Sequence, residues 1–168
     1  KTSLSFTSAD TTAPSLSSAS PADDATAVAV GGNIVLNFSE AVDVESGNIV
    51  IYKSSDDSTV ETIAVTSSQV TGTGTTQITI NPSSDLDSST EYYVQIAATG
   101  FDDSSGNSYA GITDKTSLSF TSADTTAPSL SSASPADDAT AVAVGGNIVL
   151  NFSEAVDVES GNIVIYKS

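Results

Sequence analysis

The chain has 168 residues and carries 21 acidic against 4 basic side chains, with no histidine, which gives a formal net charge of −17 at pH 7. So negative a chain disfavours nucleic acid and anionic membranes as partners, and it attracts cations instead. Without cysteine or histidine it has no disulfides, no thiolate metal sites and no Ser/His/Asp or Cys/His arrangement, so we expect neither catalytic residues nor enzyme activity.

Apolar residues alternate with polar ones in a series of short segments, which is the pattern of half-buried β-strands. In chain order, the expected strands are residues 14–20, 33–38, 47–52, 59–65, 76–80, 91–96 and 116–120. The residues expected to face inward are Ile34, Leu36, Phe38, Ile49, Ile51, Ile63, Val65, Ile78, Ile80, Tyr92, Val94, Ile96, Leu118 and Phe120. Turn-forming runs such as "PADD" and "TGTG" separate the strands. This pattern predicts an all-β, seven-stranded immunoglobulin-like β-sandwich of about 100 residues.

The two ends of the chain have the same sequence. Residues 1–54 are identical to residues 115–168, and the offset of 114 residues is the length of a domain rather than of a solenoid repeat. The boundary between units is expected in "ADTTAP", where Pro14 suits the first residue of an edge strand. We therefore expect tandem repeats, with residues 1–9 as the last strand of a preceding repeat, 10–123 as a complete Ig-like domain and 124–168 as the first three strands of the next.

Several segments resemble a known family. "TAPSLSSASPADDATAVAVGGNIVLNFSEAVD", followed by "GNIVIY", "LDSSTEYYVQI" and "FDDSSGNSYAG", is similar to the bacterial Ig-like domain of S-layer proteins and giant repetitive adhesins of the RTX type. Leu86, Thr90 and Tyr92 also resemble the tyrosine corner of such sandwiches, in which the Tyr92 hydroxyl would bond to the backbone. The resemblance implies linkers that calcium makes rigid.

Acidic loops are expected at both ends of the sandwich because strand direction alternates along the chain. Carboxylates, carbonyls and water are the ligands that Ca²⁺ takes, so the loops around Asp10 predict a calcium site at the junction between repeats. The other interpretation is that these loops are solvated turns. The predicted ligands are Asp10, Glu40, Asp43, Asp102, Asp103 and Asn107, with Asp124, Glu154 and Asp157 at the next junction.

These features predict a structural protein: an extender repeat of a bacterial adhesin or extracellular filament, as in a biofilm, with calcium as its cofactor. The expected partners are neighbouring identical repeats, head to tail, and other copies of the chain in a filament. Two alternatives remain open, a module that binds a glycan or protein and a fibre subunit completed by strand exchange between chains. The expected location is extracellular, at the bacterial cell surface, with no membrane insertion by this sequence.

Overall fold

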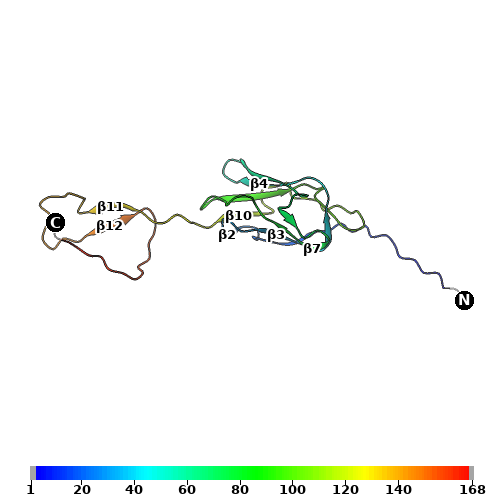
Figure 1. Ribbon diagram of the computed structural model, residues 1–168, viewed down its shortest axis with the longest axis horizontal. Helices are drawn as coiled ribbons and strands as arrows, with labels where there is room; N and C mark the ends of the chain where they lie inside the picture. Colours follow the sequence, from blue (N-terminus) through cyan, green and yellow to red (C-terminus); the bar gives the residue numbers. More distant parts are fainter. Residues whose placement is uncertain (1–2, 167–168) are drawn as a thin grey trace. The chain divides into compact units, whose positions relative to one another are not determined.

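The structure is a computed structural model that describes residues 3–166. All regular elements in this range are β-strands, which confirms the predicted all-β class. Within it, no helix is long and apolar enough to cross a membrane. The chain divides into two units, residues 1–125 and 126–168, and each has strands of its own (Figure 1).

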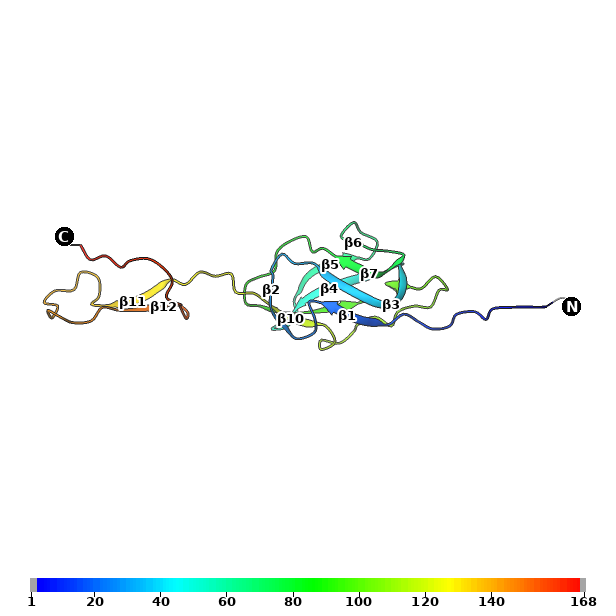
Figure 2. The same ribbon diagram turned by 90° about the horizontal axis from the view of Figure 1, so that it is seen from below.

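Two five-stranded sheets face each other in the first unit (Figures 1 and 2). The first has the order β1-β3-β7-β6, with β9 also paired to β3, and is built from β1 (Leu16–Ser20), β3 (Ile34–Val44), β7 (Thr75–Ile80), β6 (Val70–Thr71) and β9 (Phe101–Asp102). The second has the order β2-β10-β8-β4-β5 and is built from β2 (Ala25–Val28), β10 (Ser119–Ser122), β8 (Glu91–Ile96), β4 (Asn48–Lys53) and β5 (Thr59–Ala64). Strands β2 and β10 run parallel.

One apolar core lies between these two sheets. Every residue that the alternation predicted to face inward is buried. The ring of Phe120 on β10 lies 6.0 Å from the ring of Tyr92 on β8, measured between centroids. The Tyr92 hydroxyl accepts a hydrogen bond from the backbone N–H of Asp87 at 2.9 Å, which confirms the predicted tyrosine corner.

The predicted count of seven strands is not confirmed, because residues 3–166 contain twelve strands in several sheets. Each of the seven predicted segments contains a strand, and β2, β6 and β9 are additional strands of the first unit. Strands β6 and β9 have two residues each, which is too short to show a period of two. They exist because neighbouring strands pair with them, and the sequence pattern does not reveal that pairing.

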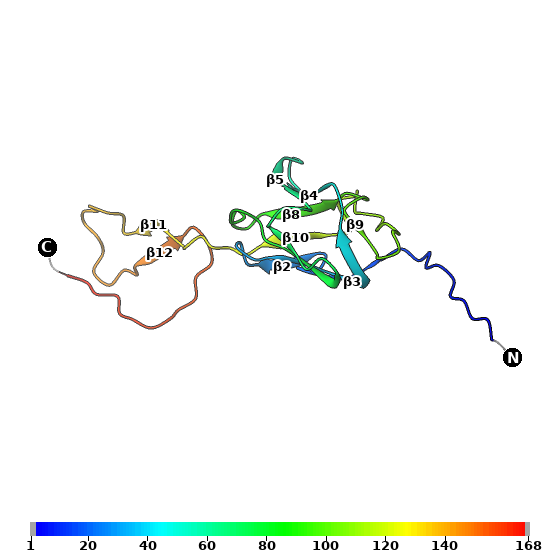
Figure 3. The same cartoon turned by 45° about the vertical axis from the view of Figure 1, so that its right-hand side comes forward.

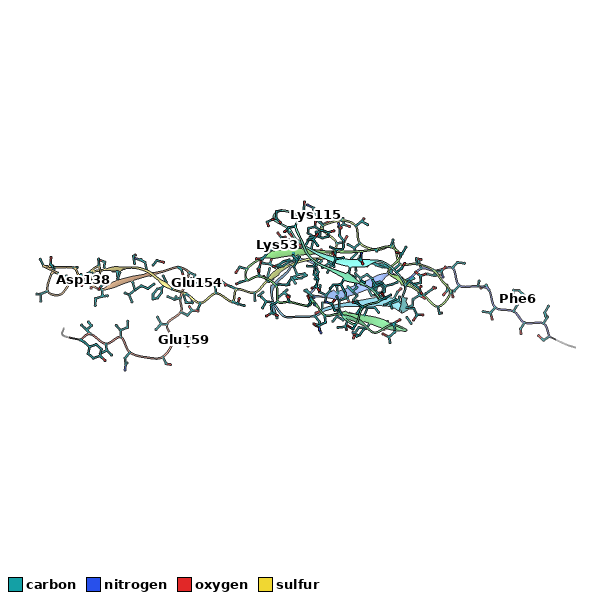
Figure 4. The ribbon with its side chains drawn as sticks, turned by 45° about the horizontal axis from the view of Figure 1, so that its top comes forward. Phe6, Lys53, Lys115, Asp138, Glu154 and Glu159 are labelled. Carbon is teal, nitrogen blue, oxygen red and sulfur yellow. The ribbon has the colours of Figure 1, made fainter. Side chains whose placement is uncertain are left out.

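The second unit contains one pair of strands, β11 (Leu130–Ser134) and β12 (Val149–Phe152). Of the three strands predicted for residues 124–168, the third does not form within the described residues, since residues 161–166 carry no strand. Residues 3–9, predicted as the last strand of a preceding repeat, also form no strand, and Phe6 projects from an extended segment (Figure 4). The division into repeats stays a prediction.

Candidate functional site

Three segments of the first unit bring carboxylates together. Asp10 lies in the segment before β1, Glu40 lies within β3, and Asp103 follows β9 directly. Because β9 pairs with the end of β3 (Figure 3), Asp103 lies close to Glu40. One carboxylate oxygen from each of these three residues lies within 4.8 Å of the other two. We call this group the carboxylate cluster.

The turn after β9 fixes the position of Asp103. Its Oδ1 accepts hydrogen bonds from the backbone N–H groups of Ser105 and Asn107, each at 2.8 Å. The turn closes through Gly106, whose φ of +82° is the left-handed conformation that glycine adopts without strain. Hydrogen bonds lower the pKa of the buried Asp103 carboxyl, first the bond from the Asn107 side chain and then those from the backbone N–H groups, because they stabilise its ionised form.

Asn107 connects two members of the carboxylate cluster. Its side-chain Nδ2 donates to Oδ2 of Asp103 at 2.8 Å and to the backbone oxygen of Asp10 at 3.3 Å. The Asp10 carboxylate accepts a hydrogen bond from the backbone N–H of Thr12 at 2.9 Å. Asn107 therefore holds the segment before β1 against the turn after β9.

Three aromatic rings support the turn after β9. The ring centroid of Phe38 lies 5.4 Å from that of Phe101 and 5.2 Å from that of Tyr109. The backbone N–H of Tyr109 donates to the carbonyl of Phe101 at 2.8 Å. Since Phe101 and Tyr109 flank Asp103 and Asn107 in the chain, packing of these rings holds both ends of the turn.

Negative charge in the carboxylate cluster is poorly compensated. The pKa of Glu40 is raised, first by loss of solvation and then by the charges of Asp103 and Asp10. No hydrogen bond to the Glu40 carboxylate is found in the part of the chain that the structure describes. The lysines of residues 3–166, Lys53 and Lys115 (Figure 4), pair instead with Asp87 and Asp57.

The other residues predicted as ligands lie outside the carboxylate cluster. Asp43 and Asp102 face each other across the β3–β9 pair, where Asp43 accepts a hydrogen bond from the Thr73 hydroxyl and Asp102 has a buried Oδ1 without a hydrogen-bond partner. In the range 3–166 no second group of three carboxylates is found, so Asp124, Glu154 and Asp157 form none.

The sequence did not predict the contacts that Asp23 and Asp24 make with β10. Ser119 on β10 donates its backbone N–H to Oδ1 of Asp23 at 2.8 Å and its hydroxyl to Oδ1 of Asp24 at 3.0 Å. These two carboxylates fasten the turn before β2 to β10. The only sequence signal was the turn motif "PADD", because its partner lies almost a hundred residues away in the chain.

Comparison with known proteins identifies the family and two solved structures. The family model of the bacterial Ig-like domain matches residues 10–122 and 124–168. The first structure, CopC from Methylosinus trichosporium OB3b, has 17% identity and a TM-score of 0.45, covering 68% of this chain and 97% of its own. The second, PcoC, a copper resistance protein from Escherichia coli, has 25% identity and a TM-score of 0.38, covering 64% of this chain and 98% of its own. No curated protein sequence matches the chain.

The structural comparison corrects two predictions made from the sequence. The adhesin or filament extender function, together with its ligand-binding and strand-exchange alternatives, is contradicted, because the similar structures are CopC and a copper resistance protein. The predicted calcium cofactor is contradicted too, since copper is the metal named for one of them. Because both TM-scores are below 0.5, however, this similarity is no evidence that the chain binds copper or has any particular activity.

The family match covers both units and is independent of these structures. It supports the predicted Ig-like domain, and it does not distinguish the S-layer or RTX-adhesin type from other members. Because the matched ranges include most of the sequence, the chain belongs to the bacterial Ig-like domain family.

Proposed function

We propose that this chain is a non-enzymatic Ig-like module of a tandem-repeat protein, and that it binds a hard divalent cation at Asp10, Glu40 and Asp103. The observation that carries the proposal is the convergence of three carboxylates from three separate segments. A divalent cation would neutralise charges that otherwise repel one another, and it would give the Glu40 carboxylate a partner, which no residue of the described range 3–166 supplies through a hydrogen bond.

The hydrogen bonds around the carboxylate cluster favour a cation over protonation. Asp103 accepts three hydrogen bonds, which stabilise its ionised form, and burial keeps the group in a medium where charge interactions are strong. Asp10 is held by its backbone oxygen through Asn107. The geometry of two of the three ligands is therefore set before any cation arrives, which lowers the ordering cost of binding.

Copper of the kind held by nitrogen or sulfur ligands does not fit these residues. The chain contains no histidine, cysteine or methionine, so imidazole, thiolate and thioether ligands are all missing. Carboxylate and carbonyl oxygens suit hard cations. The donor set, rather than the likeness to CopC and PcoC, defines the class of ion that we propose.

The remaining parts of the proposal rest on sequence. Identity between residues 1–54 and 115–168 supports a tandem series in which repeats follow one another head to tail, with a complete domain at 10–123. The absence of histidine and cysteine supports a non-enzymatic role. Membership of a bacterial Ig-like family supports a location outside the cytoplasm.

A titration with Mn²⁺, followed by electron paramagnetic resonance of the free ion, tests the cation site. We expect one Mn²⁺ per chain, and we expect Glu40→Gln to raise the dissociation constant by at least about tenfold, since even residues that only support ligands change metal affinity by 10–100-fold. The matched control is Glu154→Gln, the same residue of the repeated sequence in surroundings that lack the carboxylate cluster. This control should bind Mn²⁺ as the parent chain does.

Two results would reject the cation site. One is the absence of a stoichiometric Mn²⁺ complex, and the other is an equal effect of Glu40→Gln and Glu154→Gln. A parallel titration with Cu²⁺ adds a check, because Cu²⁺ binds a given oxygen site more tightly than Mn²⁺ does. Tight Cu²⁺ binding that Glu40→Gln leaves unchanged would place copper elsewhere on the chain.

A further inference from the structure

A large β-bulge interrupts the chain just before β10. The Val94 N–H of β8 donates to the Leu118 carbonyl at 2.9 Å. Ile96, the last residue of β8, pairs with Ile112 through two hydrogen bonds of 2.9 Å each. A single residue of β8 therefore lies opposite residues 113–117, which bulge out of the sheet. We call residues 113–117 the strap.

Hydrogen bonds give the strap a shape of its own. Oδ1 of Asp114 accepts bonds from the backbone N–H groups of Thr116 and Ser117, each at 2.8 Å. At the beginning of the strap, the Thr113 carbonyl accepts a bond from the Gln95 side chain at 2.7 Å. These bonds keep the strap folded and fix its beginning to β8.

Apolar burial does not anchor the strap to the sandwich. All five of its residues are exposed, whereas Ile112 before it and Leu118 after it are buried. Thr113 also lines an open hollow of about 300 Å³, together with Val50 of β4, so the strap is not packed on that side. A segment with few buried apolar contacts opens more easily than the elements around it.

Lys115 fastens the middle of the strap to the second sheet. Its ammonium pairs with Asp57, in the turn between β4 and β5, and lies 5.6 Å from the ring centroid of Tyr93 on β8 (Figure 4). The same Asp57 oxygen accepts a hydrogen bond from the Tyr93 hydroxyl at 3.2 Å. One carboxylate therefore joins the strap, the turn after β4 and the side chain of Tyr93.

Tyr93 is buried although it points away from the core. Neighbouring residues of a strand face opposite sides of a sheet, and Tyr92 belongs to the core between the two sheets. Tyr93 is nevertheless only 3% exposed, and its ring stacks on that of Tyr52 at 4.9 Å between centroids. Since the Lys115 ammonium lies over the Tyr93 ring, the strap contributes to its cover.

We propose that the strap opens and closes over Tyr93 while the sandwich stays folded, and that Lys115 is its latch. The closed strap buries Tyr93, and the open strap exposes the stacked pair of Tyr52 and Tyr93 beside the hollow. Both partners of the Lys115–Asp57 pair are about half exposed, so dissolved salt screens their attraction. Rising ionic strength therefore shifts the strap towards its open state. This device is independent of the cation site and of the tandem repeats.

Nitration by tetranitromethane, located by tandem mass spectrometry of peptides, measures how accessible each tyrosine is. The rate at Tyr93 is compared with that at Tyr166, which is 84% exposed. We expect Lys115→Met to raise the relative rate at Tyr93 by about three- to thirtyfold, the factor expected from losing an exposed ion pair and a cation–π contact. Raising NaCl from about 0.01 to 1 M, which shortens the Debye length from about 30 to 3 Å, should also raise this rate in the parent chain.

Matched variants separate the latch from general destabilisation. Lys53→Met removes the ion pair of Lys53 with Asp87 and should leave the Tyr93 rate unchanged. Lys115→Arg keeps the positive charge and should keep Tyr93 protected. Tyr92 is fully buried in the core and should stay unmodified in every variant.

Three results would overturn the proposal. The first is an equal rate at Tyr93 in the parent chain and in Lys115→Met. The second is a rate at Tyr93 in the parent chain that does not respond to salt. The third is nitration of Tyr92 in step with Tyr93, because the sandwich itself would then be opening.

Discussion

Replacing Phe120 with alanine removes a buried ring from β10, and the repeat provides an internal control for the change. Phe120 is 2% exposed and lies against Tyr92, whereas Phe6, the same residue of the repeated sequence, is 91% exposed. A buried Phe→Ala substitution costs about 3–5 kcal/mol of unfolding free energy through lost transfer energy and the cavity left behind. An exposed substitution usually changes stability by less than about 0.5 kcal/mol.

Urea unfolding followed by tyrosine fluorescence measures both variants, since the chain contains five tyrosines and no tryptophan. With a slope of roughly 1–3 kcal/mol per molar urea, Phe120→Ala should lower the unfolding midpoint by on the order of 2 M. A domain stability of about 5–15 kcal/mol leaves this variant measurably folded. Equal shifts for Phe120→Ala and Phe6→Ala, or a loss below about 1 kcal/mol for Phe120→Ala, would refute the assignment of residues 119–122 as a core strand.

Three smaller changes probe other contacts of the first unit. Ser119→Ala removes the hydroxyl that donates to the carboxylates of Asp23 and Asp24. The change should cost about 1.5–2 kcal/mol, the lower part of the range for a charged acceptor since both carboxylates are exposed, while Ser5→Ala should be neutral by the same urea assay. Ala27→Gly should stabilise by about 0.5–1 kcal/mol, because Ala27 has a φ of +54° and is exposed; a loss of melting temperature would contradict this. Bonds from Ser117 and Thr116 lower the pKa of Asp114 from 3.8 to about 2, so its stabilising contribution is complete above pH 4 and is lost as the pH falls towards 2. Asp114→Asn should therefore reduce the pH dependence of the urea midpoint in that window, and an unchanged profile would show that Asp114 contributes nothing.

Sequence alternation located the core strands but not every strand. Ile34, Leu36 and Phe38 were placed inward correctly because a side-chain period of two is a local property of an amphipathic strand. Strands β6 and β9 were missed, since two residues carry no period and their pairing depends on distant neighbours. Because strand direction alternates along the chain, the sequence was enough to place Asp10, Glu40 and Asp103 at the same end of the sandwich.

The same reasoning did not separate the three clustered carboxylates from Asp43 and Asp102. Asp102 is the last residue of β9 whereas Asp103 begins the turn that follows, so the two differ although they are adjacent. Which of them meets Glu40 depends on how β9 pairs with β3. That pairing joins Asp43 to Asp102, which lie 59 positions apart in the chain, and no local pattern encodes it.

The two copies of residues 1–54 separate what local sequence decides from what tertiary structure decides. Sequence by itself determined the pairing of β1 with β3, because the identical β11 and β12 pair in the same register without an opposite sheet. It did not determine the conformation of "TSLSF". At residues 116–120 this segment contains the start of β10, whereas its earlier copy at 2–6 forms no strand over the described residues. A strand edge needs partners for its backbone groups, and apolar side chains need a face to cover, so only the presence of β8 and β2 turns this sequence into part of a core.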